Sequence, residues 1–215
     1  MKKYLHLYRF VLLSAALLFG VQMKAQNQLI YNGILERGYP SAQYDNAPYY
    51  PEQYQKGKVT FRGYTYTDVS MKTDLVKGQL IILSPATAHG ITYAPEEIER
   101  AEIGGVEYKY LKEPANGWYE VIAQTDDWSI YRRNYISNTT REVRQNNMCT
   151  KFFPAQRIYL CMQGKWSAIG SINALCKHFN EHNTEIKAYA KQHDLRFDSM
   201  DIDAWQHLAE YIKGL

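Results

Sequence analysis

Short runs of β-branched, aromatic and aliphatic residues alternate with turn residues from Phe61 to Ser84, and the pattern continues to Arg133. Runs of this length and spacing predict an antiparallel β-meander. The meander needs a tight turn between successive runs. Gly104-Gly105 separates one pair of runs and Asp126-Asp127 separates another, so each is an expected turn. The expected strands of this part are 58–62, 64–74, 79–83, 98–103, 106–111, 117–124 and 128–133.

The chain is more polar after this meander. Residues 134–148 keep no alternation and predict a long loop. Three further apolar runs predict strands at 150–153, 156–162 and 165–169. Gln163-Gly164 fits a two-residue turn between the last two of them.

The apolar period becomes helical after residue 170. Ser171 is a favourable N-cap residue for a first helix, and further helices are expected from Thr184 and from Ser199 or Asp201. The expected apolar face of the first helix, at i, i+3, i+4 and i+7, consists of Ile172, Leu175, Cys176 and Phe179. Strands first and helices afterwards indicate an α+β fold.

The predicted organisation follows from these patterns. A β-rich domain covers 58–169, and a helical C-terminal segment over 170–215 packs on it. Before them, residues 26–57 form an extended lead-in that is rich in tyrosine and proline and shows no lasting period. The chain has 19 tyrosines against 7 phenylalanines, and tyrosine suits strands with one wet face because its hydroxyl reaches water.

The first 25 residues have the order of a secretory signal peptide. Lys2, Lys3 and Arg9 precede an apolar run over 10–21, and Ala25 ends the segment with a small residue. A membrane anchor needs about 20 apolar residues, and this run is shorter. We therefore expect export and cleavage after Ala25, with no transmembrane segment in the mature chain.

Removal of this peptide changes the charge of the protein. The full chain carries 25 basic and 22 acidic residues, but residues 1–25 hold four of the basic ones and no acid. The mature chain of 190 residues therefore has a formal net charge of −1. A near-neutral chain without a basic stripe gives no reason to expect nucleic-acid binding.

Two stretches carry a resemblance to a known group. The stretch from Tyr49 to Leu83, and the sequence 117–122 that runs on into 128–133, resemble uncharacterised secreted β-rich proteins of the Bacteroidetes type. These proteins pair a glycine- and aromatic-rich strand run with a hairpin and a helical tail. Their usual Asp-Gly turn is replaced here by Asp126-Asp127. The resemblance implies this architecture and export, and it assigns no activity, cofactor or site residue.

Cys149 and Cys161 are the candidates for a disulfide in an oxidising compartment. A hairpin with its turn at 154–156 would place Phe153 opposite Arg157 and, four positions further out, Cys149 opposite Cys161. Cys176 lies on the expected apolar helix face and should be buried and reduced. Three free thiols are the alternative.

Other constellations of chemically active residues are weak. His178 and His182 would share a face if the first helix continued, but two histidines without a third ligand are more often solvent-facing than metal-binding. Ser167 lacks the nucleophile elbow of hydrolases. Asp198, Asp201 and Asp203 lack the glycine and the terminal glutamate of a calcium loop, and helix capping explains the latter two. We expect no catalytic, cofactor or metal site among these residues.

The export signal and the weak site chemistry favour an exported structural or interaction module of the cell envelope, periplasmic or at the outer-membrane face. Its partner would be an envelope protein or a glycan. One alternative is a glycan- or peptide-binding module that uses exposed tyrosines. Another is an enzyme of unrecognised type, which a deep pocket with convergent polar groups would support.

Overall fold

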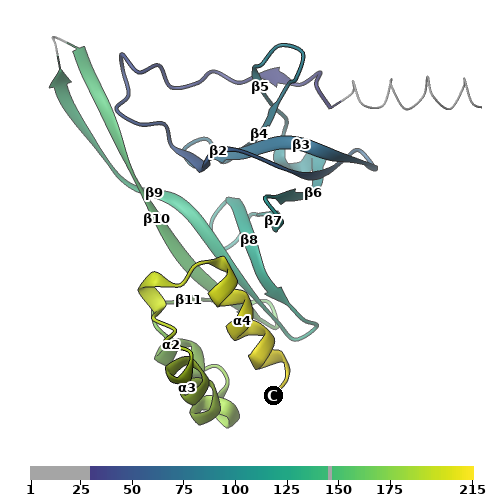
Figure 1. Ribbon diagram of the computed structural model, residues 1–215, viewed down its shortest axis with the longest axis vertical. Helices are drawn as coiled ribbons and strands as arrows, with labels where there is room; N and C mark the ends of the chain where they lie inside the picture. Colours follow the sequence, from purple (N-terminus) through teal and green to yellow (C-terminus); the bar gives the residue numbers. More distant parts are fainter. Residues whose placement is uncertain (1–29, 145–146) are drawn as a thin grey trace, which may run out of the picture.

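The computed structural model of the protein describes residues 30–144 and 147–215, and its fold is α+β (Figure 1). The strands are β1 (Ile34–Leu35), β2 (Tyr49–Phe61), β3 (Tyr64–Asp74), β4 (Gln79–Leu83), β5 (Gly90–Thr92), β6 (Ile98–Ile103), β7 (Val106–Leu111), β8 (Gly117–Gln124), β9 (Trp128–Arg144), β10 (Asn147–Met162) and β11 (Lys165–Ile169). They form one antiparallel sheet in the order β1-β5-β4-β3-β2-β6-β7-β8-β9-β10-β11. The helices α2 (Ile172–Cys176), α3 (Asn183–Gln192) and α4 (Ile202–Lys213) follow the strands. The expected fold class is therefore confirmed.

Local sequence signals are enough to set many of these bounds. Strands β3, β4, β6, β7, β8 and β11 begin and end at the predicted residues. Ser171 caps α2, because its hydroxyl accepts a hydrogen bond from the Ala174 N–H at 3.0 Å. Asp201 caps α4 in the same way through the Ala204 N–H at 2.8 Å. Such caps satisfy N–H groups that have no partner within the helix.

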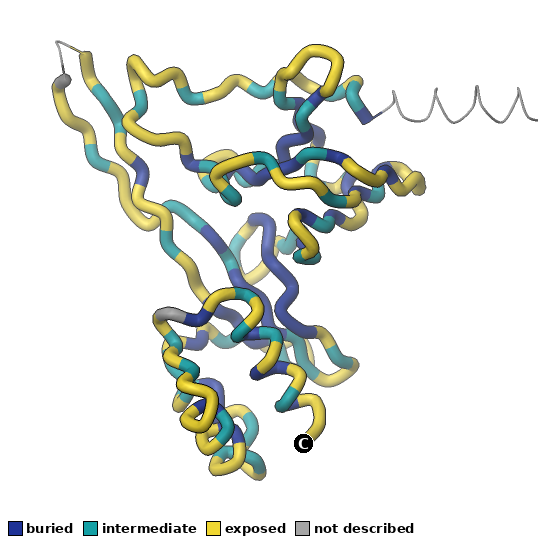
Figure 2. The backbone as a smooth tube through the Cα atoms, in the orientation of Figure 1, coloured by how far each residue is buried: buried dark blue, intermediate teal, exposed yellow. Residues whose placement is uncertain are grey.

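The predicted loop over 134–148 is wrong. Strands β9 and β10 continue through it and form a hairpin whose outer half projects from the rest of the sheet as a two-stranded ribbon (Figure 1). Most residues of this outer half are exposed or half-exposed on both faces (Figure 2). Since neither face of the ribbon is in a core, its sequence needs no apolar alternation, and the pattern used for prediction is missing.

The predicted turn at 154–156 is also wrong, because β10 passes straight through it. Cys149 and Cys161 therefore lie on one strand, and their neighbours across β9 are Glu142 and Ser129. Their separation of twelve positions along β10 corresponds to about 40 Å at the rise of an extended strand. A disulfide needs Cα atoms within about 7 Å, so the Cys149–Cys161 bridge cannot form in this structure. Cys149, Cys161 and Cys176 are free thiols, the alternative stated above.

The lead-in is held to the outer face of β3 by its tyrosines. The Tyr39 hydroxyl lies 2.9 and 3.1 Å from the two carboxylate oxygens of Asp74, which is almost fully buried. The Lys72 ammonium lies 3.5 Å from the ring centroid of Tyr49 and 4.3 Å from that of Tyr54. Burial lowers the pKa of Lys72. The expected end of the lead-in at residue 57 falls inside β2, which already begins at Tyr49.

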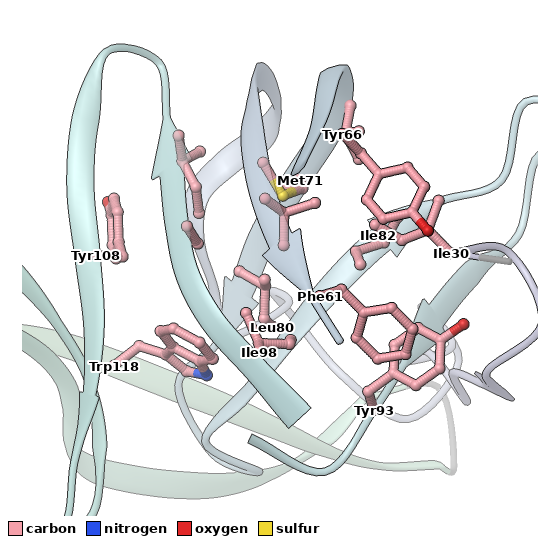
Figure 3. Packing of buried hydrophobic residues seen from close by; sticks show 14 residues of the cluster. Ile30, Phe61, Tyr66, Met71, Leu80, Ile82, Tyr93, Ile98, Tyr108 and Trp118 are labelled. Carbon is pink, nitrogen blue, oxygen red and sulfur yellow. The ribbon is translucent and has the colours of Figure 1, made fainter. Parts of the chain in front are cut away.

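Two separate apolar cores stabilise the fold. The first is enclosed by β2–β8, and in it the Phe61 and Tyr93 rings lie 4.3 Å apart (Figure 3). The second lies between β8–β11 and the helices, with Trp205 and Leu208 of α4 at its centre. Along β8, Trp118 belongs to the first core and Ile122 to the second. Strand β8 therefore connects the two cores.

Candidate binding face

The two faces of β8–β11 differ in what covers them. On one face Ile130, Ile158 and Ile169 pack against the helices in the second core. On the other face Tyr119, Tyr131 and Tyr159 form a cluster that contains no helix residue. We call this side of the sheet the aromatic–arginine face, and its members are Tyr119, Tyr131, Arg133, Tyr135, Arg157, Tyr159 and Trp166.

Strand register brings these residues together from distant parts of the chain. Tyr119 lies opposite Arg133, and Arg133 lies opposite Arg157 on the next strand. One step along, Tyr131 lies opposite Tyr159. Because alternate residues of a strand share a face, all of them lie on the same side of the sheet.

The tyrosines of this face form its floor. The Tyr119 ring centroid lies 6.3 Å from that of Tyr131 and 5.9 Å from that of Tyr159, in edge-to-face geometry. Trp166 contacts Tyr131 with a centroid distance of 5.5 Å. Tyr119 has no exposed surface, and Tyr131 and Tyr159 are each 7 % exposed. These three rings therefore pack the face, and they are not the exposed tyrosines expected for a ligand platform.

The accessible part of the face includes two arginines, Arg157, which is exposed, and Arg133, which is half-buried. The Arg133 guanidinium carbon lies 5.6 Å from the Tyr135 ring centroid, and that of Arg157 lies at the same distance from the same ring. An Nη atom of Arg133 also donates to the carbonyl oxygen of Asn116 at 3.0 Å. Within residues 30–144 and 147–215, neither arginine forms an ion pair with a carboxylate.

This arrangement can recognise anions. Like charges directly opposite on neighbouring strands are unfavourable, so an anion between Arg133 and Arg157 would stabilise both. A guanidinium presents its donors in a planar fork that matches a carboxylate, and aromatic rings beneath it hold it in place. A face of this kind is suited to bind and orient a negatively charged group.

A second polar cluster lies in the interior, on the opposite side of the same strands. Arg132 donates through Nε to Glu120, whose other oxygen accepts from the Tyr108 hydroxyl at 2.8 Å. The Asn134 amide nitrogen donates to Glu120 at 3.1 Å, and an Nη atom of Arg132 lies 3.3 Å from the Tyr50 hydroxyl. Glu120 is 2 % exposed and Arg132 is 4 % exposed. Burial and the neighbouring Glu120 raise the pKa of Tyr108. Four of its five side chains are buried, Tyr50 is half-buried, and the network joins β2, β7, β8 and β9.

The structure separates the two histidines that could have formed a metal site. Helix α2 ends at Cys176, so His178 and His182 do not lie on one helical face. His182 instead pairs with Glu185, with 2.8 Å between its Nδ1 and the carboxylate. In the part of the chain that the structure describes, no three His, Cys, Asp or Glu residues are grouped as metal ligands.

The structure places the other site candidates from the sequence in a core, on a strand and at the start of a helix. Cys176 is fully buried in the second core, and this burial raises the pKa of its thiol. Ser167 lies on β11, opposite Leu160 of β10. Asp201 caps α4, and Asp203 lies in the first turn of that helix, where acids are favourable.

Comparison of the chain with protein-family models, curated proteins and solved structures finds no match. Among the described residues, no helix has the length and apolar character that a membrane span requires.

Proposed function

We propose that this protein is an exported interaction module of the cell envelope that binds a carboxylate-bearing partner through the aromatic–arginine face. The observation that carries the proposal is the direct opposition of Arg133 and Arg157 across β9 and β10 with no carboxylate partner among the described residues. Two aligned guanidinium groups that share one tyrosine ring are preorganised for an anion. The rings beneath keep the arginines in place at little further entropic cost.

Export is supported by the order of charged, apolar and small residues at the N-terminus, which lies outside the described residues. The expected result is an envelope-fraction protein whose intact mass corresponds to a chain beginning at Gln26. A signal-deleted chain that begins at Gln26 provides the reference mass. Recovery of the protein with Met1 still attached would contradict the proposal.

Neutralising both arginines of the face is expected to remove binding of carboxylate ligands. In the variant Arg133→Gln/Arg157→Gln, each lost charge-assisted hydrogen bond should weaken binding by about tenfold. Binding would be measured by fluorescence anisotropy against acidic and neutral peptides and against uronic-acid and neutral oligosaccharides.

The matched control is Lys165→Gln, which removes one positive charge from an exposed position of the neighbouring strand β11. The control should bind like the wild type. If the control and the double variant lose the same affinity, general electrostatic attraction explains the binding, and the face has no specific role.

A further inference from the structure

One edge of β10 has neighbours at both ends and none between them. At its outer end, Thr150 exchanges backbone hydrogen bonds with the lead-in: its N–H donates to the Gln43 carbonyl at 2.8 Å, and its carbonyl accepts from Asp45 at 2.9 Å. The Asn46 side chain does the same for Phe152, donating to its carbonyl and accepting from its N–H. At the other end, β11 pairs with β10 only from Ile158 onward. Residues 153–157 have no strand neighbour on this edge among the described residues.

The backbone of this gap is ready to accept a strand. Thr150 and Phe152 both direct their N–H and C=O groups to this edge, and these directions alternate along a strand. Gln156 therefore presents its N–H and C=O to the open edge, and Pro154 presents its C=O. The gap spans five residues, or about 17 Å of extended chain.

A pocket lies along the same gap. Its volume is about 600 Å³, and it lies between residues 154–158 of β10, the start of the helical segment at Gly170 and the residues just before α4. Ile158, Ile169 and Trp205 are buried beneath it. A Cβ atom added to Gly170 would meet no atom within 4 Å, so the space beside this residue is open. Arg157 and Asp198 line the rim of the pocket with opposite charges, and the buried Ile158, Ile169 and Trp205 beneath it suit an apolar side chain.

We propose that the protein binds an extended peptide segment that adds a short strand to β10 between Phe152 and Ile158. Successive side chains of such a strand would point to opposite faces of the sheet. One places an apolar residue in the pocket on the helix side, and the next places an acidic residue beside Arg157 on the aromatic–arginine face. The preferred ligand is therefore a peptide in which apolar and acidic residues alternate over about four positions. The inference rests on the proposed function, because it assigns the carboxylate of the ligand to a peptide.

A peptide fits these observations better than a glycan does. The open edge offers backbone donors and acceptors at the repeat of a β-strand, and only another extended chain matches that repeat. Ile158 beneath the pocket lies on the helix side of the sheet and Tyr159 lies on the aromatic–arginine face, which suits the two-residue alternation of a peptide.

The test is selection of a displayed library of random nonapeptides on the purified protein, followed by binding measurements on the variants. The expected result is enrichment of peptides with alternating apolar and acidic residues. Gln156→Pro should weaken their binding at least about tenfold, because it removes the N–H at the open edge while leaving the pairing with β9 in place. Gln156→Ala keeps the N–H and should bind normally.

A second pair of variants tests the pocket independently. Gly170→Phe should fill the pocket and abolish binding, whereas Gly170→Ala should not. Absence of enriched peptides, or enriched peptides that bind Gln156→Pro and Gly170→Phe like the wild type, would overturn the strand-addition proposal.

The outcomes also separate this inference from the proposed function. If only uronic-acid oligosaccharides bind and Arg133→Gln/Arg157→Gln abolishes that binding, strand addition is overturned and the proposed function stands. If peptide binding responds to Gln156→Pro and Gly170→Phe but is unchanged in Arg133→Gln/Arg157→Gln, strand addition stands and the proposed role of the arginines fails.

Discussion

Replacement of Glu120 by alanine is expected to lower the free energy of unfolding by about 3–5 kcal/mol, the cost of leaving one partner of a buried ion pair alone. Glu120 accepts hydrogen bonds from Tyr108, Arg132 and Asn134, and all four side chains are buried. Without the carboxylate, the Arg132 guanidinium would remain in the interior with the Tyr50 hydroxyl, 3.3 Å from one of its Nη atoms, as its hydrogen-bond partner. Urea unfolding, followed by circular dichroism, measures the effect. The midpoint urea concentration should fall, while the slope of the unfolding free energy against urea concentration stays unchanged.

The control for this variant is an exposed ion pair. Glu97 pairs with Arg62 at the surface, where water screens the pair, so Glu97→Ala should shift the urea midpoint far less than Glu120→Ala does. The double variant Glu120→Leu/Arg132→Met removes both buried charges and should recover much of the loss, because no unpaired charge remains. If Glu120→Ala cost as little as Glu97→Ala, water would reach Arg132, and the network would be a solvent-accessible site.

The outer ribbon shows what apolar periodicity cannot predict. Six strands with at least one buried face were predicted to the residue, but β9 was cut short at Arg133 and β10 was divided into two strands, 150–153 and 156–162. Pro154 is read as a turn residue in the sequence, since proline breaks interior strands. In the structure its missing N–H faces the open edge of β10, where no hydrogen bond is lost. Only the assembled sheet shows that this edge of β10 has no neighbouring strand at Pro154. The sequence alone therefore led to the wrong prediction of a turn at 154–156.

The aromatic–arginine face was missed for a related reason. Aromatic and basic residues occupy every second position of β9 at Tyr131, Arg133 and Tyr135. The same spacing holds for Arg157 and Tyr159 of β10, so the pattern was visible in the sequence. The pairing of Arg133 with Arg157 depends on the register of β9 against β10. The predicted turn at 154–156 broke β10 and paired Phe153 with Arg157 instead, so the two arginines could not be brought together.

Replacement of Trp205 by alanine is expected to destabilise the second core by about 3–5 kcal/mol, the range for a large buried aromatic residue. Trp205 is 2 % exposed, and its ring lies 5.3 Å from that of Phe197 in edge-to-face geometry. Helix α4 packs on β8, and the second core contains residues from all three helices. The loss should therefore loosen the helical segment over 170–215, and limited trypsin digestion should cut first at Lys187, Lys191 or Arg196.

The same variant tests whether the two cores unfold together. The first core contains no residue of the helices, so its own contacts persist when Trp205 is removed. The expected result is an early unfolding step for residues 170–215 in hydrogen exchange, with β2–β7 still protected. Glu210→Ala, on the exposed side of α4, is the matched control and should change stability by no more than about 0.5 kcal/mol. Simultaneous loss of protection in β2–β7 and in the helices would show that β8 and the network around Glu120 couple the cores into one cooperative unit.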